Sequence, residues 1–113
     1  MLEQAARVSD MHTCPKVEVF PQGNGTALTV PHVGGPIVAA GATNVMIEGQ
    51  RAAMMGSLCT CTAGGSPYLG PTVDTIVTGS STVTINGKAA ARRGDRTAHG
   101  GVIVAGAPTV LIG

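Results

Sequence analysis

A short segment occurs three times in the chain, and this repetition constrains the fold more than any other feature. Residues 41–49 (GATNVMIEG) match residues 79–87 (GSSTVTING), and a third copy, GAPTVLIG, occupies residues 106–113. An apolar Ile-Val pair precedes each copy, at residues 37–38, 76–77 and 103–104. An apolar pair, a turn that starts with glycine and an alternating V-x-I segment are typical of a β-hairpin, so the sequence predicts three hairpin units.

The three units are circularly permuted. The first two copies are followed by related tails, AAMMGS at residues 52–57 and AARRGD at residues 90–95, whereas the third copy ends at Gly113. The missing tail, AARVSD, lies at residues 5–10. One unit is therefore split between the two ends of the chain, which predicts a closed, pseudo-threefold ring whose termini meet. A β-solenoid would also repeat apolar residues and glycine, but at a fixed short period that the uneven spacing here lacks.

Composition favours a small all-β domain. The 113 residues include 17 Gly and 7 Pro but no Trp and only one each of Tyr and Phe, as expected for short strands with small side chains and frequent turns. The repeat fills residues 1–113, which predicts one domain with no spare segment. A net charge of +1 with 12% charged residues argues against a nucleic-acid partner. No apolar run is long enough for a membrane anchor, and the first residues lack the apolar stretch of a secretory signal.

The histidines and cysteines gather in equivalent parts of the repeat. Each lies between a tail and the next hairpin: His12, Cys14, His32, Cys59, Cys61 and His99. Because the units are equivalent, these segments should meet at one end of the ring. Nitrogen and sulfur donors in a group of four are the usual ligands of zinc, and three cysteines without a secretory signal fit free thiols or metal ligands better than a disulfide framework. Redox chemistry at Cys59-Thr60-Cys61 is less favoured, because the motif lacks a two-residue spacer.

The repeat narrows the choice of ligands. Cys61 lies four residues after Ser57, and His99 lies four residues after Asp95, so these two are equivalent. His32 resembles His99 because Gly-Gly and an Ile-Val pair follow both. His12 and Cys14 then compete for the last position, and we expect them to point to opposite sides of an extended segment.

Four segments carry a resemblance to a known family: DMHTCP at residues 10–15, PHVGGPI at 31–37, KAAARRGD at 88–95 and AHGGVIV at 98–104. Together they resemble the PAAR-repeat family, and the resemblance covers nearly the whole chain. The Pro-Ala-Ala-Arg motif itself is present as QAAR at residues 4–7, RAAM at 51–54 and AAAR at 89–92. The proline is absent each time, and Met54 replaces one arginine.

The resemblance implies a conical, pseudo-threefold β fold with one structural zinc ion near its sharp tip. The family pattern of three histidines and one cysteine implies His12, His32, His99 and Cys61 as the ligands, with Cys59 and Cys14 as other candidates for the thiolate. It also implies a trimeric spike protein (valine-glycine repeat protein G-like) as partner, in a type VI secretion system or related contractile injector. We expect one monomer per trimer, effector proteins as further partners, and a cytoplasmic location before the spike leaves the cell.

The spike should contact the repeat hairpins at the wide base, around residues 45–47, 83–85 and 110–112. The alternative is an enzyme, either a zinc hydrolase or a hexapeptide-type acyltransferase with His99 as base. A hydrolytic zinc site needs an open ligand position and a nearby carboxylate. Of the six acidic residues, only Asp10 and Asp95 adjoin the ligand segments, and their repeat positions indicate turn capping. We therefore expect a protein that is not an enzyme.

Overall fold

The chain forms an elongated all-β molecule. The structure, a computed structural model, describes residues 2–63 and 71–113, and these contain no helix, so none that could span a membrane. The principal extents are 52 × 26 × 23 Å. The strands are β1 (Glu3–Ala5), β2 (Val17–Pro21), β3 (Ala27–Ala39), β4 (Met46–Ile47), β5 (Gln50–Arg51), β6 (Leu58–Ala63), β7 (Pro71–Thr75), β8 (Thr84–Ile85), β9 (Lys88–Ala89) and β10 (Ala107–Ile112). The predicted all-β fold class is confirmed.

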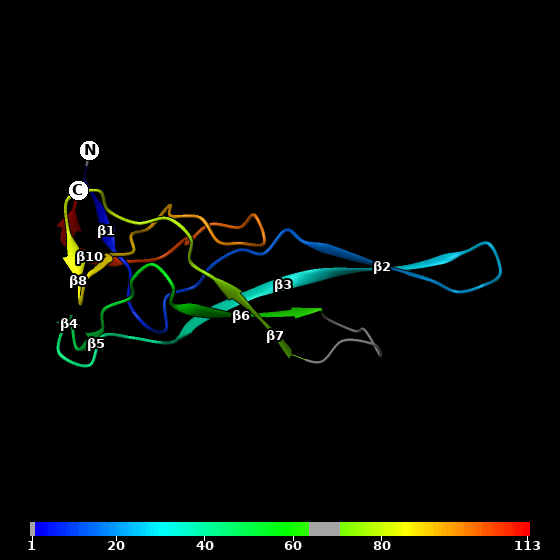
Figure 1. Ribbon diagram of the computed structural model, residues 1–113, viewed down its shortest axis with the longest axis horizontal. Coiled ribbons are helices and arrows are strands. Elements are labelled where there is room, and N and C mark those ends of the chain that lie inside the picture. Colours follow the sequence, from blue (N-terminus) through cyan, green and yellow to red (C-terminus); the bar gives the residue numbers. More distant parts are fainter. Residues whose placement is uncertain (1, 64–70) are drawn as a thin grey trace.

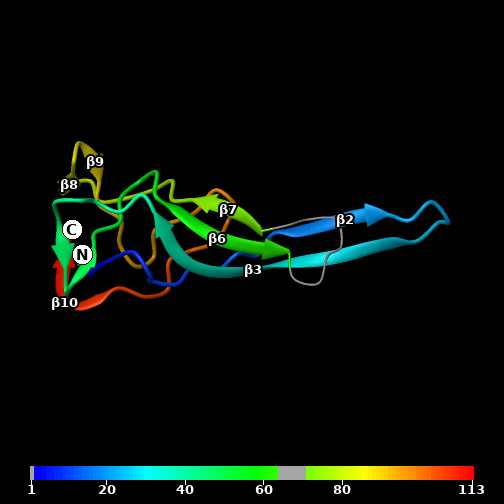
Figure 2. The same ribbon diagram turned by 90° about the horizontal axis from the view of Figure 1, so that it is seen from below.

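Three small antiparallel sheets lie together at one end of the molecule, which we call the base. They are formed by β1 with β10, β4 with β5, and β8 with β9, and each has two strands. Figures 1 and 2 show them at the left end, beside both chain termini. The β1–β10 sheet pairs Glu3 with Ile112 and Gln4 with Leu111. One of the three units is thus assembled from the two ends of the chain, as the permuted repeat predicts.

The hairpin turns follow the V-x-I segments, whereas we expected the turn to precede each V-x-I segment. The V-x-I segment forms the first strand of each local hairpin, and the second strand follows a two-residue turn, at Glu48-Gly49 or Asn86-Gly87. All four turn residues have positive φ, at 50°, 81°, 52° and 82°. Two successive left-handed residues define a type I′ turn, whose twist matches that of paired strands. The glycine that starts each copy does not make the hairpin turn, so the expected hairpin register was wrong.

Three alanines form a ring of hydrogen bonds around the pseudo-threefold axis. The amide of Ala6 donates to the carbonyl of Ala91 (2.9 Å), that of Ala91 to Ala53 (3.1 Å), and that of Ala53 to Ala6 (3.0 Å). Their side chains are 0–1% exposed. Only a small side chain lets three backbones approach one another this closely, which explains the second alanine of the pair at the start of every tail. We call these three residues the alanine triangle.

Two apolar clusters stack along this axis. The first contains the alanine triangle with Cys59 and the three isoleucines Ile37, Ile76 and Ile103. The valine that follows each isoleucine is 45–46% exposed, because neighbouring residues of an extended chain point to opposite faces. The second cluster underlies the base and contains Ala42, Ala52, Ile85 and Ala90, with Val45, Ile47, Met54, Val83 and Ile112 packed against it.

Polar side chains close the tail of each unit. Asp10 Oδ2 accepts the amide hydrogen of Arg7 at 2.8 Å, and Asp95 Oδ2 accepts that of Arg92 at 2.6 Å. In the third unit, Ser57 Oγ accepts the amide hydrogen of Met54 at 3.1 Å. The aspartates also hold the arginine guanidinium groups at 2.9 Å, and this hydrogen bonding raises the pKa of both arginines. The turn-capping interpretation of Asp10 and Asp95 agrees with these contacts.

A long hairpin projects from the other end of the body. β2 pairs with residues 27–31 of β3, and the remainder of β3 pairs with β6, giving a four-stranded sheet in the order β2-β3-β6-β7. Figures 1 and 2 show the hairpin extending well beyond β6 and β7. We call residues 17–31 the arm. It belongs to none of the three units, so the expectation that no segment lies outside the repeat was wrong.

Candidate metal centre

Two thiols and two imidazoles converge where the arm joins the body. The ligand atoms of Cys14, His32, Cys61 and His99 all lie within 4.8 Å of one another, and we call these residues the donor group. The sulfur of Cys61 lies 2.6 Å from Cys14 Sγ, 2.9 Å from His32 Nδ1 and 3.4 Å from His99 Nδ1. Cys14 Sγ lies 3.5 Å from His99 Nδ1. Cys14, His32 and Cys61 are buried, and His99 is partly exposed.

The sheet and its flanking segments position these four residues. His32 lies in β3 at the point where its partner changes from β2 to β6, with Pro31 opposite Val17 and His32 opposite Ala63. Cys61 lies in β6 opposite Gly34. Cys14 and His99 come from the segments that follow the capped tails. The rings of His32 and His99 meet edge to face, with centroids 5.6 Å apart.

Two glycines allow these segments to pack against one another. A Cβ on Gly34 would overlap the carbonyl oxygen of His12, and a Cβ on Gly101 would overlap that of Thr13. One glycine of each Gly-Gly pair after His32 and His99 therefore serves close backbone approach. These glycines place the segment around Cys14 between the other two.

His12 does not belong to the donor group. Its Nδ1 lies 2.8 Å from the carbonyl oxygen of Gly35, which can only accept, and its Nε2 lies 3.3 Å from Asp74 Oδ2. Both side chains of the His12–Asp74 pair are fully buried. The expected set of His12, His32, Cys61 and His99 thus has three members together, and Cys14 stands where His12 was expected.

His12 and Cys14 also point to the same side of the chain, contrary to expectation. Both are buried, at 3% and 6% exposure, whereas Met11 and Thr13 are exposed. Residues two apart on an extended segment share a face, and neighbours point to opposite faces. His12 and Cys14 therefore share the buried face of the segment, and Met11 and Thr13 share the exposed face.

The repeat contains a signal for Cys14. Cys14, Cys61 and His99 each lie four positions after the residue that caps a tail: Asp10, Ser57 and Asp95. They are the three symmetry-related donors, and His32 is the fourth. The residues two positions after the caps are His12, Cys59 and Thr97, and all three are buried. They form a second layer beneath the donors.

Asp74 is the residue that sequence reasoning missed. It is 1% exposed and lies in β7 opposite Cys59. Its Oδ1 accepts the amide hydrogens of His99 and Thr75, both at 2.9 Å, and its Oδ2 lies 3.9 Å from His99 Nδ1. The statement that only Asp10 and Asp95 adjoin the ligand segments was therefore wrong. Asp74 belongs to no repeat motif, so only the pairing of β6 with β7 brings it here.

The third cysteine lies apart from the donor group. Cys59 is fully buried in the first apolar cluster. Burial raises the pKa of its thiol to about 12, with smaller contributions from the charges of Asp74 and Cys61. A thiol with so high a pKa stays protonated, which makes it a weak metal ligand and a poor nucleophile.

The donor group fits a tetrahedral metal ion. With metal–ligand bonds of the usual length for zinc, the donor atoms of a tetrahedron lie about 3.3–3.8 Å apart. The observed separations span 2.6–3.5 Å for the four contacts above, so small side-chain rotations suffice. The group contains two soft sulfur atoms and two imidazole nitrogens, which suit zinc-like cations over calcium or magnesium. These residues can hold one metal ion.

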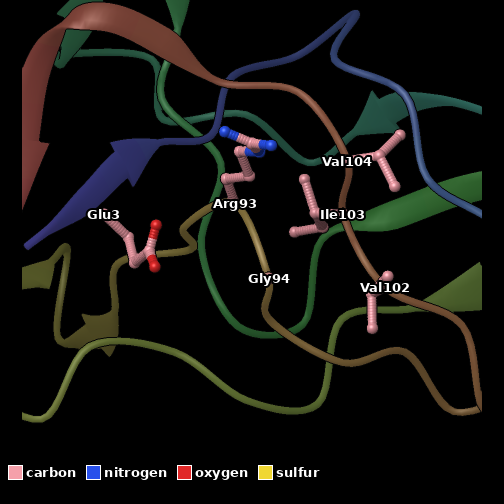
Figure 3. A pocket seen from close by; sticks show the side chains of 6 residues that line it. All are labelled: Glu3, Arg93, Gly94, Val102, Ile103 and Val104. Atoms are coloured by element: carbon pink, nitrogen blue, oxygen red, sulfur yellow. The ribbon is translucent and has the colours of Figure 1, made fainter.

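A shallow pocket of about 390 Å³ lies elsewhere, on the flank of the body. Its lining is Glu3, Arg93, Gly94, Val102, Ile103 and Val104. Figure 3 shows Glu3 and Arg93 on one side and the valines on the other. None of the donor group lines it, so this pocket and the candidate metal centre are separate features.

Fold and donor group together define an all-β protein with pseudo-threefold symmetry and a Cys₂His₂ candidate metal centre. The family model of the PAAR motif matches residues 29–105, which is more than half of the chain. The chain belongs to the PAAR-motif family, a family of type VI spike-tip proteins, and the resemblance seen in the sequence is confirmed. Comparison with curated proteins gives no match.

Proposed function

We propose that this protein is a non-enzymatic, metal-stabilised tip that caps the trimeric spike of a type VI secretion system or related contractile injector. Membership of the PAAR-motif family supports this proposal. The observation that carries it is the base, where one chain presents three equivalent two-stranded sheets around one axis. A monomer with internal threefold symmetry can contact all three subunits of a trimer in the same way.

The outward side chains of the base suit a protein partner. In the three V-x-I segments the middle residue points away from the second apolar cluster: Met46 is 57% exposed, Leu111 is 52% exposed, and Thr84 is exposed. Leu2, beside the chain termini, is 59% exposed. Uncharged side chains at equivalent positions, next to open strand edges, fit the end of a spike built from β-strands.

Zinc is the metal that we propose for the donor group, and its role is structural. When bound, it would tie the segment after each capped tail, and the root of the arm, to one point. Small domains with few large apolar side chains commonly need such a cross-link, and a structural zinc ion contributes folding free energy directly. Cys14, His32, Cys61 and His99 would hold it.

Three observations favour a structural over a hydrolytic role. The donor group supplies four protein ligands, which fills a tetrahedron. Asp74, the one carboxylate that lies close to a donor atom among the described residues, is buried and accepts two backbone hydrogen bonds. The flank pocket contains none of the four donors. A general base needs to reach a water molecule that faces substrate, and Asp74 is not placed to do so.

The proposal includes a sequence of locations. The protein would assemble with its spike in the cytoplasm and leave the cell with it when the apparatus contracts. Effector proteins would travel on the same spike. The arm extends past the donor group and would be the leading feature of the tip.

Stoichiometry tests the function directly. The protein is mixed with a purified trimeric spike protein of the valine-glycine repeat class, and the complex is measured by native mass spectrometry. We expect one copy per trimer. Three copies per trimer, or no complex with spike proteins of the matching apparatus, would contradict the proposal.

A further inference from the structure

We propose that Cys14 and Cys61 form a disulfide under oxidation by a peroxide, and that this reaction releases the metal from the donor group. The inference rests on the proposed metal site and adds a redox sensitivity to it. The set of three histidines and one cysteine implied by the sequence has a single thiol, so it could not form an internal disulfide. The structure places two thiols in the donor group instead.

The two sulfur atoms lie close enough to form a disulfide and also close enough to bind one metal ion. They lie 2.6 Å apart, on residues 47 positions apart in the sequence. A disulfide needs a separation of about 2.05 Å, and two thiolates on one tetrahedral zinc ion lie about 3.8 Å apart. The observed distance falls between these values, so rotations of the two side chains reach either arrangement. Cys14 lies in the segment between β1 and β2, and Cys61 lies in β6, so the two thiols come from separate parts of the backbone.

The exposures of the three cysteines indicate which one reacts first. Cys14 is 6% exposed, and Cys59 and Cys61 are 0% exposed. A small oxidant such as hydrogen peroxide therefore meets Cys14 before the other two. Cys59 packs among the isoleucines of the first apolar cluster, two residues from Cys61 on a stiff strand, which disfavours a Cys59–Cys61 bridge.

The reaction has two steps that balance. The thiolate of Cys14 attacks one oxygen of hydrogen peroxide, the O–O bond breaks, and the departing hydroxide takes a proton to become water. This leaves Cys14 as a sulfenic acid. The thiolate of Cys61 then attacks the sulfur of Cys14, the S–O bond breaks, and a second hydroxide leaves as water. Two thiolates lose two electrons in total, peroxide gains them, and the metal ion leaves with its charge unchanged.

Loss of the metal follows because the disulfide removes two of the four ligands. His32 and His99 alone cannot hold a zinc ion tightly, since structural sites use four donors. The disulfide would itself join two separate segments of the body. A tip that moves from a reducing to an oxidising compartment would thus exchange one cross-link for another at the same place.

The experiment uses the full chain loaded with zinc and treated with hydrogen peroxide. A chromogenic chelator measures released zinc, intact mass measures the loss of two hydrogens, and peptide mapping identifies the linked cysteines. We expect about one zinc ion released per Cys14–Cys61 disulfide. Cys59→Ala, which removes the third thiol without placing a polar group in the apolar cluster, should give the same disulfide and the same ratio of released zinc. Zinc release without a disulfide, or a disulfide that includes Cys59 or joins two chains, would overturn the proposal.

A matched variant tests whether zinc release requires the second thiol or only a four-donor site. Cys14→His keeps four donors but leaves one thiolate, so it should hold zinc and release it at least ten times more slowly under the same peroxide dose. Release as fast as from the wild type would overturn the proposal, and so would the absence of zinc from the wild-type protein. Spike binding is measured separately on reduced protein, so its failure would contradict the proposed function and leave the disulfide result intact.

Discussion

The base and the donor group, at opposite ends of the body, differ in how closely they follow the threefold repeat. At the base, the three units give sheets of the same kind, with the β4–β5 and β8–β9 hairpins sharing a turn type. At the donor group, the three equivalent positions carry two cysteines and one histidine, and the fourth donor, His32, lies at the root of the arm, outside the three units. The alanine triangle lies in the core between these ends. Symmetry is retained at the end proposed to meet a trimer and lost at the end proposed to hold one ion.

The loss of symmetry has a chemical reason. A tetrahedron has a threefold axis, so three equivalent donors can take three corners, but the fourth must come from outside the repeat pattern. His32, at the root of the arm, supplies it. The equivalent positions are free to differ in residue type, because either sulfur or imidazole nitrogen can occupy a corner.

Cys14→Ala should have the largest effect and most sharply tests the metal end. Removing one of four ligands should lower zinc affinity more than 100-fold, and thermal stability should fall with it because metal affinity contributes to folding. His12→Asn should cost only about 10–100-fold, as is usual for residues that act through a ligand's neighbours. Zinc affinity is measured by competition with a chelator. A larger loss in His12→Asn than in Cys14→Ala would identify His12, and not Cys14, as the ligand.

Met46→Glu tests the base by placing a charge where contact with the spike is proposed. Met46 is 57% exposed, so the change should leave the melting temperature nearly unaltered. An unpaired charge buried at an apolar contact costs about 3–5 kcal/mol, so spike binding should be lost. Val19→Glu, in the arm, is the control, because Val19 is 58% exposed and lies in β2, which Figure 1 shows far from the base. If both variants bind the spike equally well, the base is not the contact surface.

Ala91→Leu tests the packing of the alanine triangle, which lies between the base and the donor group. The side chain of Ala91 is 1% exposed beside Ala6 and Ala53, so a leucine would overpack the axis. Overpacking typically costs about 1–3 kcal/mol, which denaturant unfolding can measure. Ala98→Leu, at an exposed position, should cost little. Equal stabilities for the two variants would mean that the alanine triangle is not tightly packed.

Ser57→Ala should cause the smallest loss of stability. Together with Asp95→Ala, it compares a neutral cap with a charged one. It removes the hydrogen bonds from Met54 and to the carbonyl of Ala40, at a cost of about 0.5–1.5 kcal/mol for a neutral bond. Asp95→Ala should cost more, because Asp95 holds both an amide and a guanidinium group. Thermal unfolding of the two variants gives the comparison. The reverse order would show that the charged caps add no stability.

Local patterns predicted much of the body because the residues that determine each unit lie close together in the sequence. The three copies of V-x-I and the capping aspartates act over short distances, and they predicted the strands of the base and the capped tails. The hairpin turns were misplaced, and the alanine triangle was not predicted. Asparagine-glycine at residues 86–87 also marks the correct turn, although the expected hairpin placed it at the end of a strand.

Long-range pairing explains what was missed. Asp74 reaches the donor group only because β7 pairs with β6, and no repeat marks that pairing. The arm lies between Cys14 and His32, where the resemblance did not distinguish an inserted hairpin from the body. Cys14 was within reach of the sequence, since its offset from Asp10 equals that of Cys61 from Ser57. The family pattern of three histidines favoured His12 instead.

The split unit at the base has a consequence for the order of folding. β4–β5 and β8–β9 are joined by two-residue turns and can form as soon as their own residues are available, on the microsecond scale typical of hairpins. β1 must wait for β10, because Glu3 pairs with Ile112 across almost the entire chain. Contacts between such distant residues slow folding. During synthesis the base therefore closes last, because its three sheets are complete only when β10 has left the ribosome.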